Sequence, residues 1–554
     1  MPLVDDVFAV IIDGSLLGPV LGFDAQVRLA RINRACSRLY RAAWPHMWRA
    51  RVASSVSSTF KGPKHEVRRM LRRAVEHSKP EHVRALVDCA INGCDTIDGC
   101  ERMRNIIQGQ LFDGQSFLHI AARLIRNRFT AERLNVLELL LEAGGKELAW
   151  LRIVRVRNDD VDANATALHL CATSNSVIAV EALVHVGGKS LLLARTGRGA
   201  TCLHSAVVSG NPAVVRTLIE LGGSRLLEAT DTEGNSCLMK AAAAGRVDHV
   251  RTLVREGGKS LLMSRNINGA SCLFIAAQHG RLAVVEELLR CGGRELLMTT
   301  LNDGASCLSV AAVHSYLDVV LCLISHGGRE LVNIVSTDIG TSALHLAAFK
   351  GSRAIVEALV ACGGQELMMM RLRGNHDDGR TCLHVAASQG ATDVAVFLYE
   401  RGGNELLFAT DNENRSALFL AVGQGHSDVV VRMLYVGGAE LLMLCKSDDI
   451  SCLVLAAKRG NCEMVSMLFG FANEFRKGPD GNVCNNSANK FFRKQLKLAL
   501  AACTYHGHRD VIEYLQGVSA RRIRPTAPPV PPPLQLPPTS HWFQTFAQST
   551  CCIF

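Results

Sequence analysis

Hydrophobic residues recur through the middle of the chain in an order that repeats about every 35 residues. Each unit has a Ser or Thr, a Leu two residues later, two small apolar residues, and a second apolar stretch that ends in a Gly pair. The pairs are Gly144-Gly145, Gly187-Gly188, Gly222-Gly223, Gly257-Gly258, Gly292-Gly293, Gly327-Gly328, Gly363-Gly364, Gly402-Gly403 and Gly437-Gly438. The Leu residues are Leu118, Leu168, Leu203, Leu238, Leu273, Leu308, Leu344, Leu383, Leu418 and Leu453. The Gly pairs and the Leu residues recur with the same spacing, so this part of the chain is a repeat array.

Each unit predicts two short helices. In the unit that starts at Ser236, this side chain precedes an apolar run and can accept a backbone N–H as an N-cap. Leu238, Ala241 and Ala242 then share one helix face, and Gly245 ends the helix, as Gly does at that place. A second apolar stripe follows at Val247, Val250, Leu253 and Val254.

We expect Gly257-Gly258 to end the second helix of that unit. Neither helix is long enough to be stable alone, because isolated helices below about 12 to 15 residues are marginal in water. Stacking of the pairs gives one continuous core. The N-cap position is Ser or Thr in all ten units: Ser116, Thr166, Thr201, Ser236, Ser271, Ser306, Ser342, Thr381, Ser416 and Ser451. The fold class is therefore all-α.

The units resemble the ankyrin repeat over roughly residues 113–515. The motifs that carry the resemblance are Thr201-Cys202-Leu203-His204, Ser342-Ala343-Leu344-His345-Leu346-Ala347-Ala348 and Thr381-Cys382-Leu383-His384-Val385-Ala386-Ala387. The chain departs from the family in two ways: Cys or Ala replaces the usual Pro, and the period is about two residues longer than 33, with Gly-Gly-x-x-Leu-Leu after the second helix. The resemblance implies an ankyrin-type solenoid of about ten repeats, with connecting fingers of altered shape.

The resemblance also implies a protein partner that contacts the finger tips and the two residues before the helix-closing Gly. The candidate contact residues are Arg195, Arg198, Asp231, Glu233, Gln278, His279, Phe349, Lys350, Ser388, Gln389, Asp411, Glu413, Lys458 and Arg459. Early fingers are basic and late fingers are acidic, which favours a partner of opposite polarity. The alternative is a surface that is only solvated. We treat Asp231 as an exposed residue.

Cysteines and histidines recur at fixed repeat positions. The cysteines are Cys202, Cys237, Cys272, Cys307, Cys382 and Cys452, and the histidines are His119, His169, His204, His345 and His384. One thiol per layer satisfies neither a disulfide nor a zinc site, because stacked helices lie about 8–10 Å apart. We expect the cysteines to be small buried hydrophobes. The family resemblance implies that the histidines are structural, and we expect no metal, cofactor or catalytic residue.

The overall charge does not indicate that the protein binds nucleic acid. The formal net charge is +10 among 554 residues, but the Arg and Lys residues are spread out and no basic stripe alternates with aromatic residues. The acidic start Met1-Pro2-Leu3-Val4-Asp5-Asp6 does not resemble a signal peptide, and no run of 18 uncharged apolar residues occurs. We expect an intracellular, cytoplasmic protein with free thiols.

The chain divides into five parts. Residues 1–60 form a helical segment, 61–112 a degenerate N-terminal cap with a helix pair at 65–92, and 113–471 the array. Residues 472–518 contain a long loop at 472–494 and a C-terminal capping repeat at 495–515. Residues 519–554 form a Pro-rich disordered tail.

The N-terminal segment resembles an F-box, a helical segment that docks onto the adaptor subunit of a cullin-type ubiquitin ligase. Residues 27–40 have helical apolar spacing, and an aromatic ending follows at Trp44, Met47 and Trp48. The candidate docking residues are Val7, Phe8, Leu29, Ile32, Leu39, Trp44 and Trp48. The alternative is a helical cap for the array.

The C-terminal tail carries two further motifs. Residues 521–538 favour polyproline II and act as a stiff spacer, although Arg522-x-x-Pro525-x-x-Pro528 resembles a ligand for Src-homology-3 domains. The chain ends Cys551-Cys552-Ile553-Phe554, which fits C-a-a-X prenylation at Cys551. The alternative is a chance match in a Cys-rich chain.

We therefore expect a non-catalytic adaptor that binds a protein on its concave face and finger tips, with two alternatives for its ends. In the first, the N-terminal segment recruits a ubiquitin ligase and the array is its substrate receptor. In the second, the protein is a plain scaffold tethered to a membrane by a prenyl group, with no ligase role.

Overall fold

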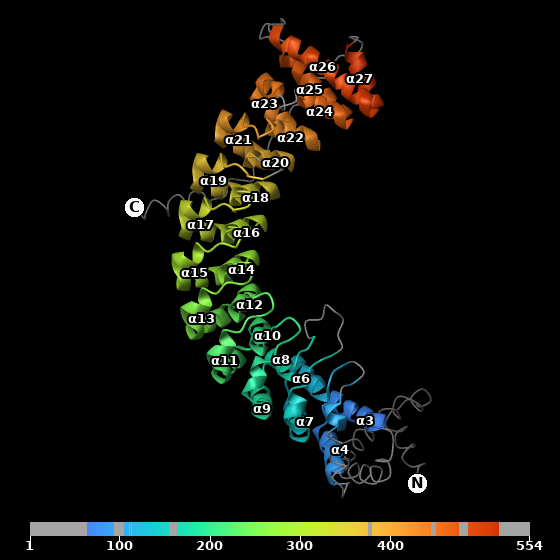
Figure 1. Ribbon diagram of the computed structural model, residues 1–554, viewed down its shortest axis with the longest axis vertical. Helices are drawn as coiled ribbons and strands as arrows, with labels where there is room; N and C mark the ends of the chain where they lie inside the picture. The colour runs from blue at the N-terminus through green and yellow to red at the C-terminus, as the bar shows by residue number, and fades with distance from the viewer. Residues whose placement is uncertain are drawn as a thin grey trace, which may run out of the picture. The chain divides into compact units, whose positions relative to one another are not determined.

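The computed structural model of the chain describes residues 64–519, except 93–104, 110, 112–113, 155–162, 375–378, 445–449 and 476–485. The F-box-like segment, the Pro-rich tail and Cys551 lie outside the described residues. The described residues form helices joined by turns and fingers and contain no β-strand, as the repeat pattern predicts. The chain divides into two compact units, Met1–Leu261 and Leu262–Phe554, and the helices of each follow in chain order (Figure 1).

The first unit is a stack of helix pairs. The pairs are α3 (Lys64–Glu76) with α4 (Pro80–Asn92), α6 (Phe117–Asn127) with α7 (Ala131–Ala149), α8 (Ala167–Ala172) with α9 (Val177–Gly187), α10 (Cys202–Ser209) with α11 (Pro212–Leu227), and α12 (Cys237–Ala244) with α13 (Val247–Leu262). A 3-10 helix, Lys189–Leu193, follows α9. The short inner helices α6, α8, α10 and α12 pack on one another in order, and the longer outer helices α7, α9 and α11 do the same. The helix pair predicted at residues 65–92 is present as α3 and α4.

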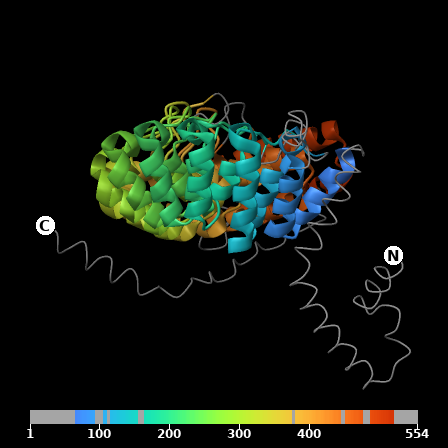
Figure 2. The ribbon, with the colours of Figure 1, turned by 90° about the horizontal axis from the view of Figure 1, so that it is seen from below.

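The second unit repeats this arrangement. Its pairs are α14 (Cys272–Gln278) with α15 (Leu282–Leu297), α16 (Cys307–Val313) with α17 (Leu317–Val332), α18 (Ala343–Lys350) with α19 (Arg353–Met368), α20 (Cys382–Ser388) with α21 (Thr392–Leu407), α22 (Ala417–Gln424) with α23 (Ser427–Met443), α24 (Cys452–Arg459) with α25 (Cys462–Phe475), and α26 (Asn486–His506) with α27 (Arg509–Ser519). The fingers of each unit emerge on one side of its helix pairs (Figure 2).

The inner helices begin where the sequence predicts. All ten predicted Ser and Thr residues are N-caps with extended backbone. At Ser236, for example, the side-chain oxygen accepts the backbone N–H of Met239 at 3.4 Å. Gly245 then ends α12 in the left-handed conformation, with φ 74° and ψ 26°. Local cap chemistry therefore determines the ends of this helix.

The Gly pair ends the regular outer helix, as expected, and a short further helical turn follows it within the same element. In α11 the chain turns at Gly223, with φ 60° and ψ −157°, and then makes a further helical turn. This combination of angles is almost restricted to glycine. The extra turn buries Leu226 and Leu227, and a Cβ on Gly222 would lie 2.5 Å from Leu226 Cδ2. The residues after the Gly pair thus place two more apolar side chains in the core, Leu-Leu in most repeats and Leu148-Ala149, Leu331-Val332 and Leu367-Met368 in others.

The loop expected at residues 472–494 was wrong in part. Residues 476–485 lie outside the described residues, but α26 begins at Asn486. Its buried face contains Phe492, Gln495, Ala499 and Cys503 at helical spacing. The residues that suggested the loop, Gly478-Pro479-Asp480-Gly481 and Asn485-Asn486, precede this buried face and, except for Asn486, lie outside the described residues, whereas residues 486–494 are helical.

The six repeated cysteines are buried hydrophobic side chains, as expected. Their thiols are free. Cys202 Sγ, for example, donates to the carbonyl oxygen of Leu192 at 3.4 Å, and burial raises its pKa to about 12. At neutral pH this thiol is therefore protonated and part of the core.

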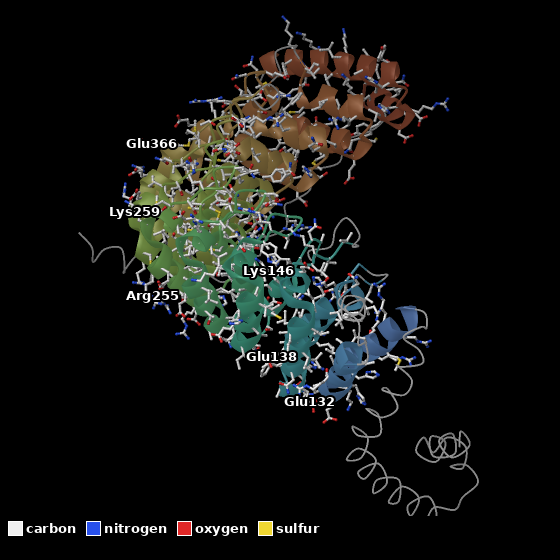
Figure 3. The ribbon with its side chains drawn as sticks, turned by 60° about the horizontal axis from the view of Figure 1, so that its bottom comes forward. Glu132, Glu138, Lys146, Arg255, Lys259 and Glu366 are labelled. Carbon is white, nitrogen blue, oxygen red and sulfur yellow. The ribbon has the colours of Figure 1, made fainter. Side chains whose placement is uncertain are left out.

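Charged residues cover the outer helices. Glu132, Glu138 and Lys146 of α7 are exposed, and Figure 3 shows them together with charged side chains of α13 and α19. No helix within the described ranges combines the length and apolarity needed to cross a membrane.

Candidate protein-binding surface

The candidate pairs before the helix-closing Gly lie at the C-terminal ends of inner helices in the second unit. Phe349 is 48% exposed, and Lys350 lies beside its ring, with Nζ 5.9 Å from the centroid. Gln278 and Ser388 are partly exposed. The other members, which are exposed, are His279, Lys350, Gln389, Lys458 and Arg459. Their repeat position therefore leaves these side chains available to a partner.

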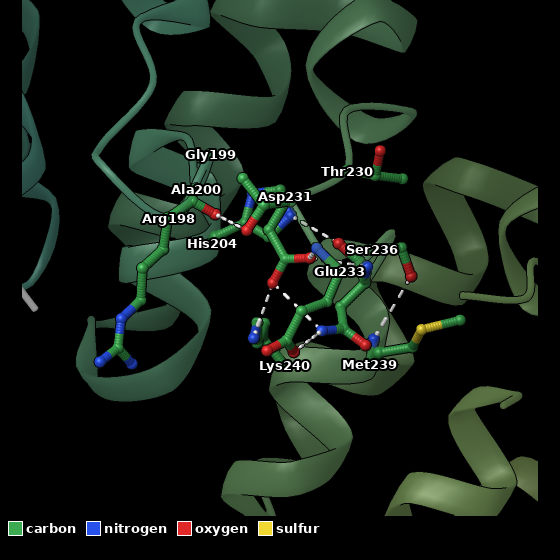
Figure 4. A network of polar contacts seen from close by, with 12 residues as sticks. Arg198, Gly199, Ala200, His204, Thr230, Asp231, Glu233, Ser236, Met239 and Lys240 are labelled. Atoms are coloured by element: carbon green, nitrogen blue, oxygen red, sulfur yellow. Dashed lines mark hydrogen bonds and ion pairs between the residues drawn. The ribbon is translucent and has the colours of Figure 1, made fainter. Parts of the chain in front are cut away.

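Asp231 is buried, so its treatment as an exposed contact residue was wrong. Its Oδ1 accepts the backbone N–H groups of Glu233 at 2.9 Å and Asn235 at 2.8 Å. Its Oδ2 lies 3.1 Å from Asn235 Nδ2 and 2.8 Å from Lys240 Nζ. Figure 4 shows this network. Burial alone would raise the pKa of Asp231, but the bonds from Lys240 and Asn235 outweigh it and hold the pKa below its usual value. Asp231 shapes the finger.

Asp411 has the same internal role in the second unit. Its Oδ1 accepts the backbone N–H groups of Glu413 at 3.0 Å and Arg415 at 2.8 Å, and Arg415 Nε donates to Oδ2 at 2.7 Å. Glu413 is half exposed, but its Oε2 lies 3.4 Å from Arg415 Nη1. Asp448 and Asp449 lie outside the described residues. The acidic character expected of the late fingers is therefore largely neutralised where the structure describes them.

The side chain of Arg195 connects two neighbouring fingers by hydrogen bonds, and we call this connection the strap. Its Nη1 donates to the carbonyl of Gly199 in its own finger at 3.1 Å and to the carbonyl of Thr230 in the next. Arg265 and Arg371 make equivalent bonds, to Gly269 and Thr300 and to Gly379 and Thr410. The guanidinium of Arg195 is thus positioned by backbone oxygens.

The sequence contained a signal for this strap that periodicity did not reveal. Arg195, Arg265 and Arg371 stand at the start of their fingers, whereas Thr230, Thr300 and Thr410 occupy the same place in the following repeats. Each Thr also forms an isolated β-bridge, to Ser236, Ser306 and Ser416. Each of these Arg fingers is followed by a Thr finger, but Val335 occupies the position between Thr300 and Arg371, so the two kinds do not alternate strictly.

The repeated histidines link neighbouring repeats. Nδ1 of His204 accepts the backbone N–H of Thr201 at 3.2 Å and lies 2.9 Å from its hydroxyl oxygen. Because Nδ1 accepts, the neutral ring carries its proton on Nε2, which lies 3.1 Å from the carbonyl oxygen of Asn235. His119, His169 and His384 reach the next repeat in the same way. The structural role implied by the family resemblance is confirmed for these four.

Burial keeps these rings neutral. It lowers the pKa of His119, His169, His204, His345 and His384 to about 4. Arg152 lowers the pKa of His169 further, whereas at His204 the carboxylate of Asp231 raises the pKa and Lys240 and Arg195 lower it. The rings of His169 and His204 contact fingers of the first unit through the carbonyls of Ala200 and Asn235.

A pocket of about 480 Å³ lies in that part of the first unit. Helices α6, α8, α10 and α12 and the fingers at 196–200 and 231–233 line it. Its charged lining residues are Arg126, Arg198, Asp231, Glu233 and Lys240. Arg198 and Glu233 are exposed, as expected of finger tips. Within the described residues no group of three or more His, Cys, Asp or Glu side chains is placed to hold a metal ion.

A family model described as ankyrin repeats (3 copies) matches residues 118–226, 224–296, 273–370 and 365–443. The chain therefore belongs to the ankyrin repeat family. A search of curated proteins gave no match. Ankyrin repeats indicate a protein–protein interaction scaffold, and the family is typically non-catalytic.

Proposed function

We propose that the protein holds a polypeptide partner against the C-terminal ends of its inner helices and the adjoining fingers. The observation that carries the proposal is Phe349, a large aromatic side chain 48% exposed at the end of α18. Aromatic residues, Phe among them, are enriched at protein interfaces, so an exposed aromatic side chain is a candidate anchor for a partner. The matching position of α14 holds the pair Gln278-His279, and that of α20 holds Ser388-Gln389.

A matched pair of photo-crosslinkers tests this proposal. Tyr435 of the outer helix α23 is 47% exposed, nearly the same as Phe349. A benzophenone amino acid placed at Phe349 should crosslink a partner polypeptide in cell extract, and the same probe at Tyr435 should not. Crosslinks confined to Tyr435 would show that the outer helices are the binding face.

The ligase hypothesis adds a role for the N-terminal segment: the array selects a substrate and residues 3–49 recruit a cullin-type ligase through its adaptor. Its support is the spacing of Leu29, Ile32 and Leu39 and the aromatic pair Trp44 and Trp48. The full chain should retain the adaptor in a pull-down, and a chain lacking residues 3–49 should not. Equal retention would leave the plain scaffold.

The alternative places the scaffold at a membrane through Cys551. A single prenyl chain gives reversible attachment, to which Arg521, Arg522 and Arg524 would add an attraction screened by salt. Cys551→Ser should abolish membrane fractionation without changing thermal stability. An intact mass that retains Ile553 and Phe554 and shows no lipid would exclude the modification.

A further inference from the structure

The pocket lined by α6, α8, α10 and α12 contains several hydrogen-bond donors that have no acceptor within the described residues. Arg198 is exposed, and its guanidinium makes no hydrogen bond or ion pair within the part of the chain that the structure describes. Figure 4 shows it extending away from Asp231 and Lys240. The hydroxyls of Ser205 and Ser209, on α10, likewise make no hydrogen bond within that part. These groups line the pocket together.

The negative charges in this lining are partly neutralised from within. Asp231 is closed off, because Lys240 and Asn235 occupy its carboxylate. Glu233 remains on the rim, where its Oε2 accepts Asn235 Nδ2 at 2.9 Å. A guanidinium paired with a carboxylate forms a charge-assisted bond that is about twice as strong as a neutral one. Glu233 disfavours a dianion such as a phosphoryl group more than a single carboxylate, by ordinary Coulomb repulsion.

We propose that this pocket binds the carboxylate side chains of an acidic segment of a partner polypeptide, with Arg198 as the main donor. The pocket is lined by residues of four successive inner helices, α6, α8, α10 and α12, which suits an extended segment rather than one small ion. Val208, 43% exposed in the same lining, offers an apolar contact to the aliphatic part of such a segment. The inference rests on the proposed function, in that the segment belongs to a bound protein.

A labelled peptide tests the pocket without knowledge of the natural partner. The probe is a fluorescein-labelled twelve-residue peptide of alternating Glu and Ala, titrated with the full-length protein, and the matched ligand is the Gln–Ala peptide. The Glu–Ala peptide should bind at least about ten-fold more tightly, because the neutral peptide lacks the charge-assisted bonds. Equal binding of the two peptides would overturn the proposal.

Two single-charge variants locate the binding. Arg198→Gln should lower the affinity of the protein for the Glu–Ala peptide about ten-fold. Arg216→Gln removes an equally exposed cation from α11, outside this pocket, and should change binding less than about two-fold. Equal losses in the two variants would mean that the peptide senses only net charge. A phosphoserine–Ala peptide that binds much more tightly than the Glu–Ala peptide would overturn the carboxylate assignment.

The two proposals fail in different experiments. If Phe349 crosslinks a partner but Arg198→Gln leaves peptide binding unchanged, the scaffold function stands and the acidic-segment pocket is wrong. If the peptide titrations behave as expected and Phe349 captures nothing, the pocket stands and the proposed binding face of the second unit is wrong.

Discussion

The repeat that starts at Thr201 and the one that starts at Ser236 cap their inner helices in different ways. In the first, His204 bonds to the cap residue with one ring nitrogen and to Asn235 of the next repeat with the other. In the second, Met239 stands at the matching position and is a buried apolar side chain. In the finger that leads into Ser236, Asp231 instead bonds locally, to Asn235 of the same finger and to Lys240 of the helix that follows.

The two repeats thus show two kinds of polar contact, one that connects neighbouring repeats and one that forms within a single finger and its helix. Arg195 and His204 both reach forward to the next finger, through the carbonyls of Thr230 and Asn235. Asp231 makes all its bonds within its own finger and helix. Neighbouring repeats with the same helix pattern therefore contribute differently to the stability of the array.

Acidification should produce the largest effect and should act on the histidine repeats. The folded pKa of the five rings is about 4, below the unfolded value of about 6.5, so below pH 6.5 the unfolded state binds more protons. Stability is complete above pH 6.5 and is lost as the pH falls toward 4, by up to roughly 3 kcal/mol for each ring. Urea unfolding at pH 7.5 and 5.0 measures the loss. Hydrogen exchange should show α10 losing protection before α12, and the reverse order would contradict the assignment.

Replacing the histidine should cost more than replacing its counterpart. His204→Leu leaves the Thr201 N–H and the Asn235 carbonyl without their partner, at a cost of roughly 2–4 kcal/mol. Met239→Leu is a volume-conserving change and should cost less than about 1.5 kcal/mol. Denaturant midpoints of the two variants decide this, and similar values would mean that the ring packs without bonding.

Asp231→Ala should destabilise by about 2–3 kcal/mol, because it removes the acceptor for several donors in a buried finger. Asp303 is the matched control: it is exposed and accepts the backbone N–H of Ala305 at 3.0 Å. Asp303→Ala should cost less than about 1 kcal/mol. Thermal unfolding of both variants tests the difference. Equal losses of stability would mean that the bonds of Asp231 contribute no more than those of an exposed aspartate.

The strap should give the smallest effect. Arg195→Met removes charge-assisted bonds to two carbonyls, but at an exposed site, so a cost of about 1 kcal/mol is expected. Arg198→Met should be within about 0.5 kcal/mol of the native protein, because that side chain makes no internal bond. Denaturant unfolding of the two variants measures this difference. Indistinguishable midpoints would show that the bonds of Arg195 to the two fingers do not contribute to stability.

The sequence alone determined the repeat, the helix pairs and their starts. Ser236 and Gly245 act on backbone groups within a few residues of themselves, so a short window contains the information needed to place both ends of α12. The burial of Cys202 and its equivalents also followed from periodicity, because every repeat presents the same face to the core.

Only the tertiary structure decided which charged residues are free. Arg195 and Arg198 are three positions apart and look equivalent in the sequence, yet one bonds to a carbonyl 35 residues away and the other stands in open solvent at the pocket. Asp231 was misjudged because its carboxylate is occupied by donors of its own finger and by Lys240 of the following helix, which the spacing of the repeat does not reveal. The bond from Arg195 to Thr230 joins parts of the chain brought together by stacking, and local pattern does not contain it.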